Sequence, residues 1–64
     1  MHIVKENLKQ LRKFKKLTQQ QVADKLGITR ACYSGYEQGR RQPSMDILRK
    51  ICEVLNCSAD EIIN

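Results

Sequence analysis

The stretch TQQQVADKLGITRACYSGYEQ, residues 18–38, predicts two short helices that are joined by a tight turn at residues 27–29. Val22, Ala23 and Leu26 recur at helical spacing, which gives the first of these helices one apolar face. Ala23 is small, so a second helix can cross the first one closely at this position. The stretch therefore predicts a closely crossed pair of helices.

Residues at the ends of both helices have the chemistry of helix caps. Thr18 is suited to N-cap the first helix, and Gln21, three residues later, can complete a capping box. Gly27 follows the last apolar residue of that helix and can adopt a left-handed conformation at little steric cost. Thr29 then caps a second helix over residues 30–38. These features predict a helix-turn-helix, whose second helix is a candidate to enter the major groove of DNA.

Over nearly its whole length the chain resembles the Xre/Cro-type helix-turn-helix family of bacterial and phage repressors. The matching residues are LTQQQVADKLGITRACYSGYEQGRRQP at 17–43, with LKQLR at 8–12 and LRKICEVLNCSADEII at 48–63. An apolar helix-turn-helix pattern alone would be weak evidence for this family. The large number of matching residues at fixed spacings makes the resemblance specific. The resemblance implies an all-α, compact five-helix domain of the lambda-repressor-like type, with the helix-turn-helix at its centre.

The segment before the helix-turn-helix predicts a first helix over residues 1–16. Val4, Leu8 and Leu11 recur at the spacing of one helix face, and Phe14 continues that apolar stripe. Lysine and arginine occupy much of the remaining surface of this helix. We expect this basic face to be exposed to solvent.

The segment after the helix-turn-helix predicts a fourth helix and a short fifth one. Ser44 is a plausible N-cap for the fourth helix. The apolar face of that helix comprises Ile47, Leu48, Ile51, Cys52 and Leu55. Ser58 and Glu61 form a second capping-box pattern, which opens a fifth helix ending at residues 62–63. We therefore expect residues 1–64 to form a single domain.

Size and charge narrow the class of function. The chain has 64 residues, a net charge of +5 and a pI near 9.4. A basic balance in so small a domain suits a polyanion such as nucleic acid, although a merely solvated surface would give the same numbers. The apolar runs are too short to span a bilayer and no signal-peptide core is present, so we expect no membrane association.

Three cysteines, Cys32, Cys52 and Cys57, are an odd number and form no Cys-x-x-Cys pair. We expect reduced thiols in a cytoplasmic protein. A metal site made by Cys52, Cys57 and His2 is the alternative, but the ligand spacings of zinc motifs are absent. We therefore expect no metal and no cofactor.

The expected DNA-binding surface combines the start of the first motif helix with the exposed face of the second. Gln19 is expected to contact a phosphate and also to buttress the second helix. Arg30 can donate two hydrogen bonds to a guanine or clamp a phosphate, and the sequence leaves both uses open. Gly35 departs from the family's longer polar side chain and is expected on the exposed reading face. The candidate DNA-binding residues are Thr18, Gln19, Gln20, Thr29, Arg30, Ala31, Ser34, Gly35, Tyr36, Gln38, Arg40 and Arg41.

The same resemblance assigns roles to four further side chains. It implies an ion pair between Arg12 and Glu37 that ties the first helix to the third. Two ordinary exposed charges are the alternative, and such a pair would contribute only about 0–1 kcal/mol. Tyr33 is expected in the core because its position in the motif is apolar, and Tyr36 is expected to pack its ring while its hydroxyl reaches a phosphate.

The leading prediction for function is sequence-specific binding of double-stranded DNA by a transcriptional regulator that acts as a repressor. The alternative is a protein-interaction module, such as an antitoxin or an adaptor, that keeps the fold. We do not expect the protein to be an enzyme, because His2 is the sole histidine and the sequence offers no pairing of a nucleophile with a general base. We expect no small-molecule effector, and a weak homodimer formed by Ile62 or Ile63, joined by Val54 and Leu55.

Overall fold

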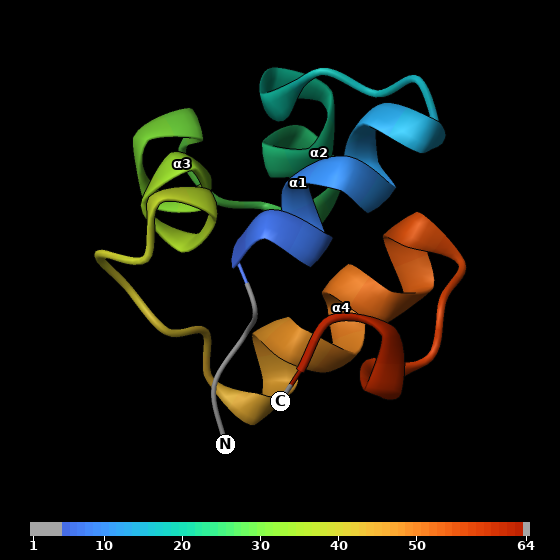
Figure 1. Cartoon of the computed structure of the whole chain (residues 1–64). Coiled ribbons are helices and arrows are strands. Elements are labelled where there is room, and N and C mark those ends of the chain that lie inside the picture. Colours follow the sequence, from blue (N-terminus) through green and yellow to red (C-terminus); the bar gives the residue numbers. More distant parts are fainter. Residues whose placement is uncertain (1–4, 64) are drawn as a thin grey trace.

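Four α-helices and one 3-10 turn make up the computed structural model, which describes residues 5–63 (Figure 1). They are α1 (Lys5–Phe14), α2 (Gln19–Leu26), α3 (Arg30–Gln38), α4 (Met45–Leu55) and η1 (Ala59–Glu61). The residues described contain no strand, so the predicted all-α class is confirmed. The helix-turn-helix is α2 and α3, which pack against each other, while α1 packs on α3 and α4 packs on α2.

The first helix ends two residues before the predicted end. Lys16 takes the left-handed conformation, with φ of 61°, and the Leu17 N–H donates to the Arg12 carbonyl at 3.2 Å. This hydrogen bond, with one from the Lys16 N–H to the Lys13 carbonyl at 2.9 Å, closes the helix in a Schellman arrangement. The predicted contribution of Val4 lies outside the described residues.

The predicted caps of α2 and α3 are confirmed. The Gln21 N–H donates to Thr18 Oγ1 at 3.0 Å and the Thr18 N–H donates to Gln21 Oε1 at 2.8 Å, which completes the capping box. The Cys32 N–H donates to Thr29 Oγ1 at 3.1 Å. Gly27 ends α2 with φ of 73°, in the left-handed region. These local interactions fix where the turn of the motif begins and ends.

Replacing Gly27 tests the backbone of this turn without a packing change. No atom lies within 4 Å of the position that a Cβ would take, so only the left-handed conformation opposes a side chain. We expect Gly27→Val to lower the free energy of unfolding by at least about 1–2 kcal/mol in urea titrations. Gly27→Asn is the matched control and should lose less, because asparagine tolerates this conformation. Equal stability of the valine variant and the original protein would contradict the assignment.

The core lies where the four helices meet. The buried apolar side chains are Leu8, Val22, Ala23, Leu26, Tyr33, Tyr36, Leu48, Ile51, Leu55 and Ile62. Tyr33 is completely buried, as predicted, and meets Tyr36 edge to face with ring centroids 6.3 Å apart. The prediction for Phe14 is wrong: it is the last residue of α1 and borders a hollow in the surface, so 78% of it is exposed.

The predicted fifth helix is only the single 3-10 turn η1. The Ser58 N–H donates to Glu61 Oε2 at 2.8 Å, which starts the turn as predicted. Ile62, with φ of −124° and ψ of −6°, leaves helical geometry and is completely buried. So short a helix gains little from its own hydrogen bonds, so nothing in the segment itself favours a longer one. The count of five α-helices is therefore corrected to four.

Candidate nucleic-acid interface

One carboxylate joins the first three helices. Glu37, near the end of α3, accepts hydrogen bonds from Arg12 Nε at 2.5 Å and from Arg12 Nη2 at 3.2 Å. It also accepts from Gln19 Nε2 at 3.0 Å and from Tyr33 Oη at 2.6 Å. Arg12 belongs to α1 and Gln19 to α2. The orientation of α3 is therefore fixed by polar contacts to both neighbouring helices.

The implied Arg12–Glu37 ion pair is confirmed, and it is buried. Only 8% of Arg12 and 6% of Glu37 are exposed. Burial acts to raise the pKa of Glu37, but the hydrogen bonds from Arg12, Tyr33 and Gln19 outweigh it and lower that pKa. The hydrogen bond to Glu37 likewise raises the pKa of Arg12 against the opposing effect of burial. Both groups are therefore held in their charged forms.

The lowered pKa of Glu37 predicts a loss of stability in acid. Because the unfolded chain takes up a proton at Glu37 at higher pH than the folded chain, acid favours unfolding. The contribution of Glu37 should be complete above its ordinary pKa of about 4.3 and should disappear as the pH falls through its lower folded value. Urea titrations from pH 7 to pH 2 should show this loss. A Glu37→Gln variant, which cannot ionise there, should give a flatter curve; curves of equal steepness would contradict the prediction.

A row of polar side chains occupies the outward face of α3. Ala31 and Gln38 are exposed and Ser34 is half-buried. Gln38 Nε2 donates to Ser34 Oγ at 3.0 Å, and Arg40 Nε donates to Gln38 Oε1 at 2.8 Å. Arg30 is exposed at the start of the helix. The structure therefore brings most of the predicted reading residues onto one continuous surface.

At the start of α2, the side chain of Gln19 contacts Glu37 of α3. The predicted buttressing role of Gln19 is confirmed by its hydrogen bond to Glu37, and the side chain is half-buried. Gln20 is exposed, and its Nε2 donates to Asp24 Oδ1 at 2.8 Å. Thr18 and Thr29 are also exposed. Their hydroxyls accept the capping bonds, so these residues first serve to shape the motif.

Two predicted contact residues are buried. Gly35 was expected on the exposed face, but the side chain of Arg41 covers it. Tyr36 is only 6% exposed, and its hydroxyl accepts a hydrogen bond from Cys32 Sγ at 3.6 Å. Burial raises the pKa of Tyr36 to about 12. The sequence contained no local signal for the cover over Gly35, because it depends on a residue beyond the end of the helix.

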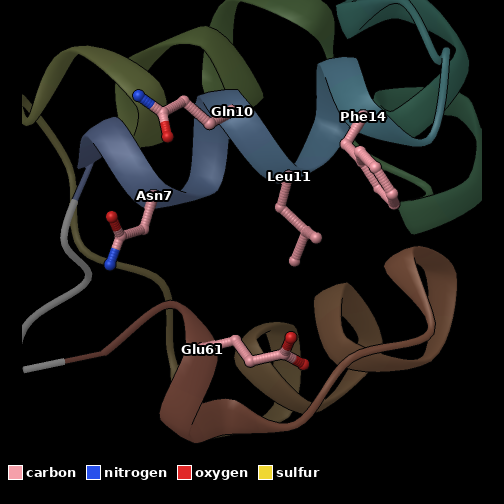
Figure 2. Close-up of a pocket in the computed structure, with 5 residues that line it drawn as sticks. All are labelled: Asn7, Gln10, Leu11, Phe14 and Glu61. Carbon is pink, nitrogen blue, oxygen red and sulfur yellow. The ribbon is translucent and has the colours of Figure 1, made fainter.

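A hollow of about 500 Å³ opens elsewhere on the molecule, between α1 and η1 (Figure 2). It is lined by Asn7, Gln10, Leu11, Phe14 and Glu61. Figure 2 shows Leu11 and Phe14 extending from α1 toward this hollow, with Glu61 opposite. None of the candidate DNA-binding residues lines it.

Residues 5–63 contain neither a metal-binding cluster nor a membrane-spanning helix. No group of three histidine, cysteine or acidic residues in this range is placed to hold a metal ion. His2, one member of the alternative metal site, lies outside this range, and Cys52 and Cys57 are free thiols. Nor is any helix in this range long and apolar enough to cross a membrane.

Comparisons with known proteins agree with this geometry. Residues 8–62 match the model of a protein family described as "Helix-turn-helix". The uncharacterised HTH-type transcriptional regulator YqaE of Bacillus subtilis (strain 168) is 53% identical over 58 residues, which are 91% of this chain and 50% of YqaE. The chain spans about half the length of several curated relatives that it matches, YqaE among them.

Two solved structures share the arrangement of helices. The P22 c2 repressor in complex with a synthetic operator superposes with a TM-score of 0.89 at 22% identity, over 100% of this chain and 97% of the repressor. The biofilm regulator SinR in complex with DNA superposes with a TM-score of 0.82 at 29% identity, over 91% of this chain and 97% of SinR.

Proposed function

This chain belongs to the helix-turn-helix family, and from that premise we propose that it is the DNA-binding domain of a transcriptional regulator. In this proposal α3 enters the major groove of double-stranded DNA. The observation that carries the proposal is the Glu37 network, which fixes α3 against α1 and α2 while Arg30, Ala31 and Gln38 stay exposed on the outward face of α3. A domain seated in the groove blocks other proteins from the same site, so repression is its simplest effect.

The contacts divide into two groups. Arg30, Ala31 and Ser34, in the first half of α3, face the base edges. The backbone contacts come from the start of each motif helix and from the loop after α3. These residues are Thr18, Gln19, Gln20, Thr29, Gln38 and Arg40, with the Tyr36 ring supporting the helix beneath them.

The relatives support DNA over a protein partner. The SinR structure contains DNA, and YqaE is described as a transcriptional regulator. The alternative of an antitoxin or adaptor module is therefore not favoured. The proposal places the domain with the chromosome in the cytoplasm and includes no enzyme activity and no small-molecule effector.

Selection of bound duplexes from random DNA, followed by titration of the selected duplex at rising salt, tests the proposal. A groove-binding protein should select a defined site, and the logarithm of its affinity should fall linearly with the logarithm of salt concentration. Arg40→Ala should reduce this slope by about one, whereas Arg30→Ala should relax one base position at a cost of about 1–3 kcal/mol. Failure to bind any duplex at low salt would overturn the proposal.

We further propose a weak homodimer that places two α3 helices in successive turns of the groove, about 34 Å apart. The structure narrows the expected dimer surface. Leu55 and Ile62 are completely buried, so they close the core and cannot meet a partner. Val54 and Ile63 remain partly exposed at the C-terminal end of the domain.

Ile63→Glu should weaken this dimer. A charged side chain in an apolar contact must lose its hydration without a partner, which opposes association. Sedimentation equilibrium with a two-half-site duplex should then show single, independent binding for the variant and paired binding for the original protein. Gln10→Glu, at an exposed position of α1, adds the same single negative charge and is the control that should still pair. Independent binding by the original protein would exclude the dimer.

A further inference from the structure

Gly35 lies on the outward face of α3 but is not open to solvent. It follows Ala31 by four residues and precedes Gln38 by three, so all three share one side of the helix. An added Cβ at Gly35 would lie 3.0 Å from Arg41 Cδ and 3.2 Å from Arg41 Cγ. The stem of Arg41 therefore occupies the space that a side chain would fill in the middle of this face.

The backbone after α3 holds Arg41 in this place. Gly39 ends the helix in the left-handed conformation, with φ of 78°, which turns the chain back. The carbonyl of Gly35 then accepts the Arg40 N–H at 2.9 Å and the Arg41 N–H at 3.2 Å. The backbone of Arg41 is thus hydrogen-bonded to the helix that its side chain covers.

The guanidinium of Arg41 extends along α3 toward the start of the helix. Its Nη1 donates to Cys32 Sγ at 3.8 Å, three residues before Gly35. Arg41 is exposed, and among residues 5–63 the one ion pair is Arg12–Glu37, so no carboxylate there neutralises it. A planar group with several hydrogen-bond donors is therefore held on the half of α3 that carries Arg30 and Ala31.

We infer that Arg41 is a specificity-determining residue that reads a base edge, with guanine as the base that its two donors match. This inference rests on the proposed function and deepens it. On sequence alone Arg41, which follows the second motif helix, is expected to meet the flanking DNA backbone. The present inference replaces that expectation. Gly35 is the residue that makes room, since any larger side chain there would displace the arginine stem from the helix.

The neighbouring arginine serves as the matched control. Arg40 differs from Arg41 by one position, carries the same charge, and directs its Nε to Gln38 Oε1 at 2.8 Å near the end of α3. Arg40 should therefore meet the flanking phosphate backbone, where a contact carries no sequence information.

In vitro selection from random duplexes, with the original protein, Arg41→Ala, Arg41→Lys and Arg40→Ala in parallel, tests the inference. We expect Arg41→Ala to lose preference at one base position, by about 5- to 150-fold. Arg41→Lys should lose the same preference although it keeps the positive charge, because an ammonium cannot form the paired contact. Arg40→Ala should weaken binding to all sequences and leave the selected site unchanged.

Gly35→Ala provides a second measurement with a different readout. Alanine favours the helix over glycine, and the exposed Arg41 side chain can move aside, so the melting temperature should rise by about 2–8 °C. The same variant should lose the base preference that Arg41→Ala loses. A more stable protein with altered specificity separates this role from a merely structural one.

The outcomes distinguish this inference from the proposed function. If the original protein selects no site, the proposed function fails. If it selects a site and Arg41→Lys or Gly35→Ala selects the same site, the proposed function stands and the inference about Arg41 is overturned.

Discussion

Glu37→Ala should lower the free energy of unfolding by about 3–5 kcal/mol, the largest effect expected for a polar residue of this chain. The change removes the carboxylate that Arg12, Gln19 and Tyr33 all contact. The guanidinium of Arg12 would then remain buried without an opposite charge, because the side chain is only 9% exposed. A buried charge without a partner destabilises the fold by far more than an exposed ion pair stabilises it.

Urea unfolding at pH 7 measures this effect. Glu53→Ala is the matched control, because Glu53 is exposed on α4 and has no ion pair among residues 5–63. We expect that control to change stability by no more than about 0.5 kcal/mol. The double variant Arg12→Ala/Glu37→Ala should cost less than the sum of the single variants, because each single change leaves one charge unpaired. Equal stability of Glu37→Ala and Glu53→Ala would show that the pair contributes nothing.

The features that could be predicted from the sequence are those that depend on a few adjacent residues. Thr18 and Gln21 form their capping box, and Gly27 and Thr29 delimit the turn. Each of these interactions is local, so its geometry follows from residue type and spacing. The Arg12–Glu37 pair spans 25 residues and was expected from the family resemblance alone.

The features that could not be predicted depend on the packing of distant segments or on where an element ends. Gly35 has the spacing of an exposed residue, yet Arg41 covers it after the chain reverses at Gly39. Phe14 has the spacing of a core residue, yet α1 ends at that position. The Ser58–Glu61 capping box predicts a fifth helix, yet only one 3-10 turn forms and Ile62 is buried outside it. Periodicity gives the direction of a side chain and leaves open what covers it.

Two apolar residues of α1, Leu8 and Phe14, should differ strongly in their contribution to the free energy of unfolding. Leu8 is completely buried, whereas Phe14 is 78% exposed at the edge of the hollow in Figure 2. Both are apolar and both belong to the stripe that the sequence predicts. Leu8→Ala removes buried methyl groups and leaves a cavity in the core of a 64-residue chain. We expect it to lower the free energy of unfolding by about 2–5 kcal/mol.

Phe14→Ala, although it removes a larger side chain, should change the same free energy by no more than about 0.5 kcal/mol. Paired urea titrations at pH 7 measure both variants against the original protein. Because stability in so small a domain is only a few kcal/mol, Leu8→Ala should approach complete unfolding. Its DNA binding should then fall with the folded fraction, while Phe14→Ala should bind as the original protein does. A larger loss for Phe14→Ala than for Leu8→Ala would contradict the burial of Leu8 and the exposure of Phe14 in this structure.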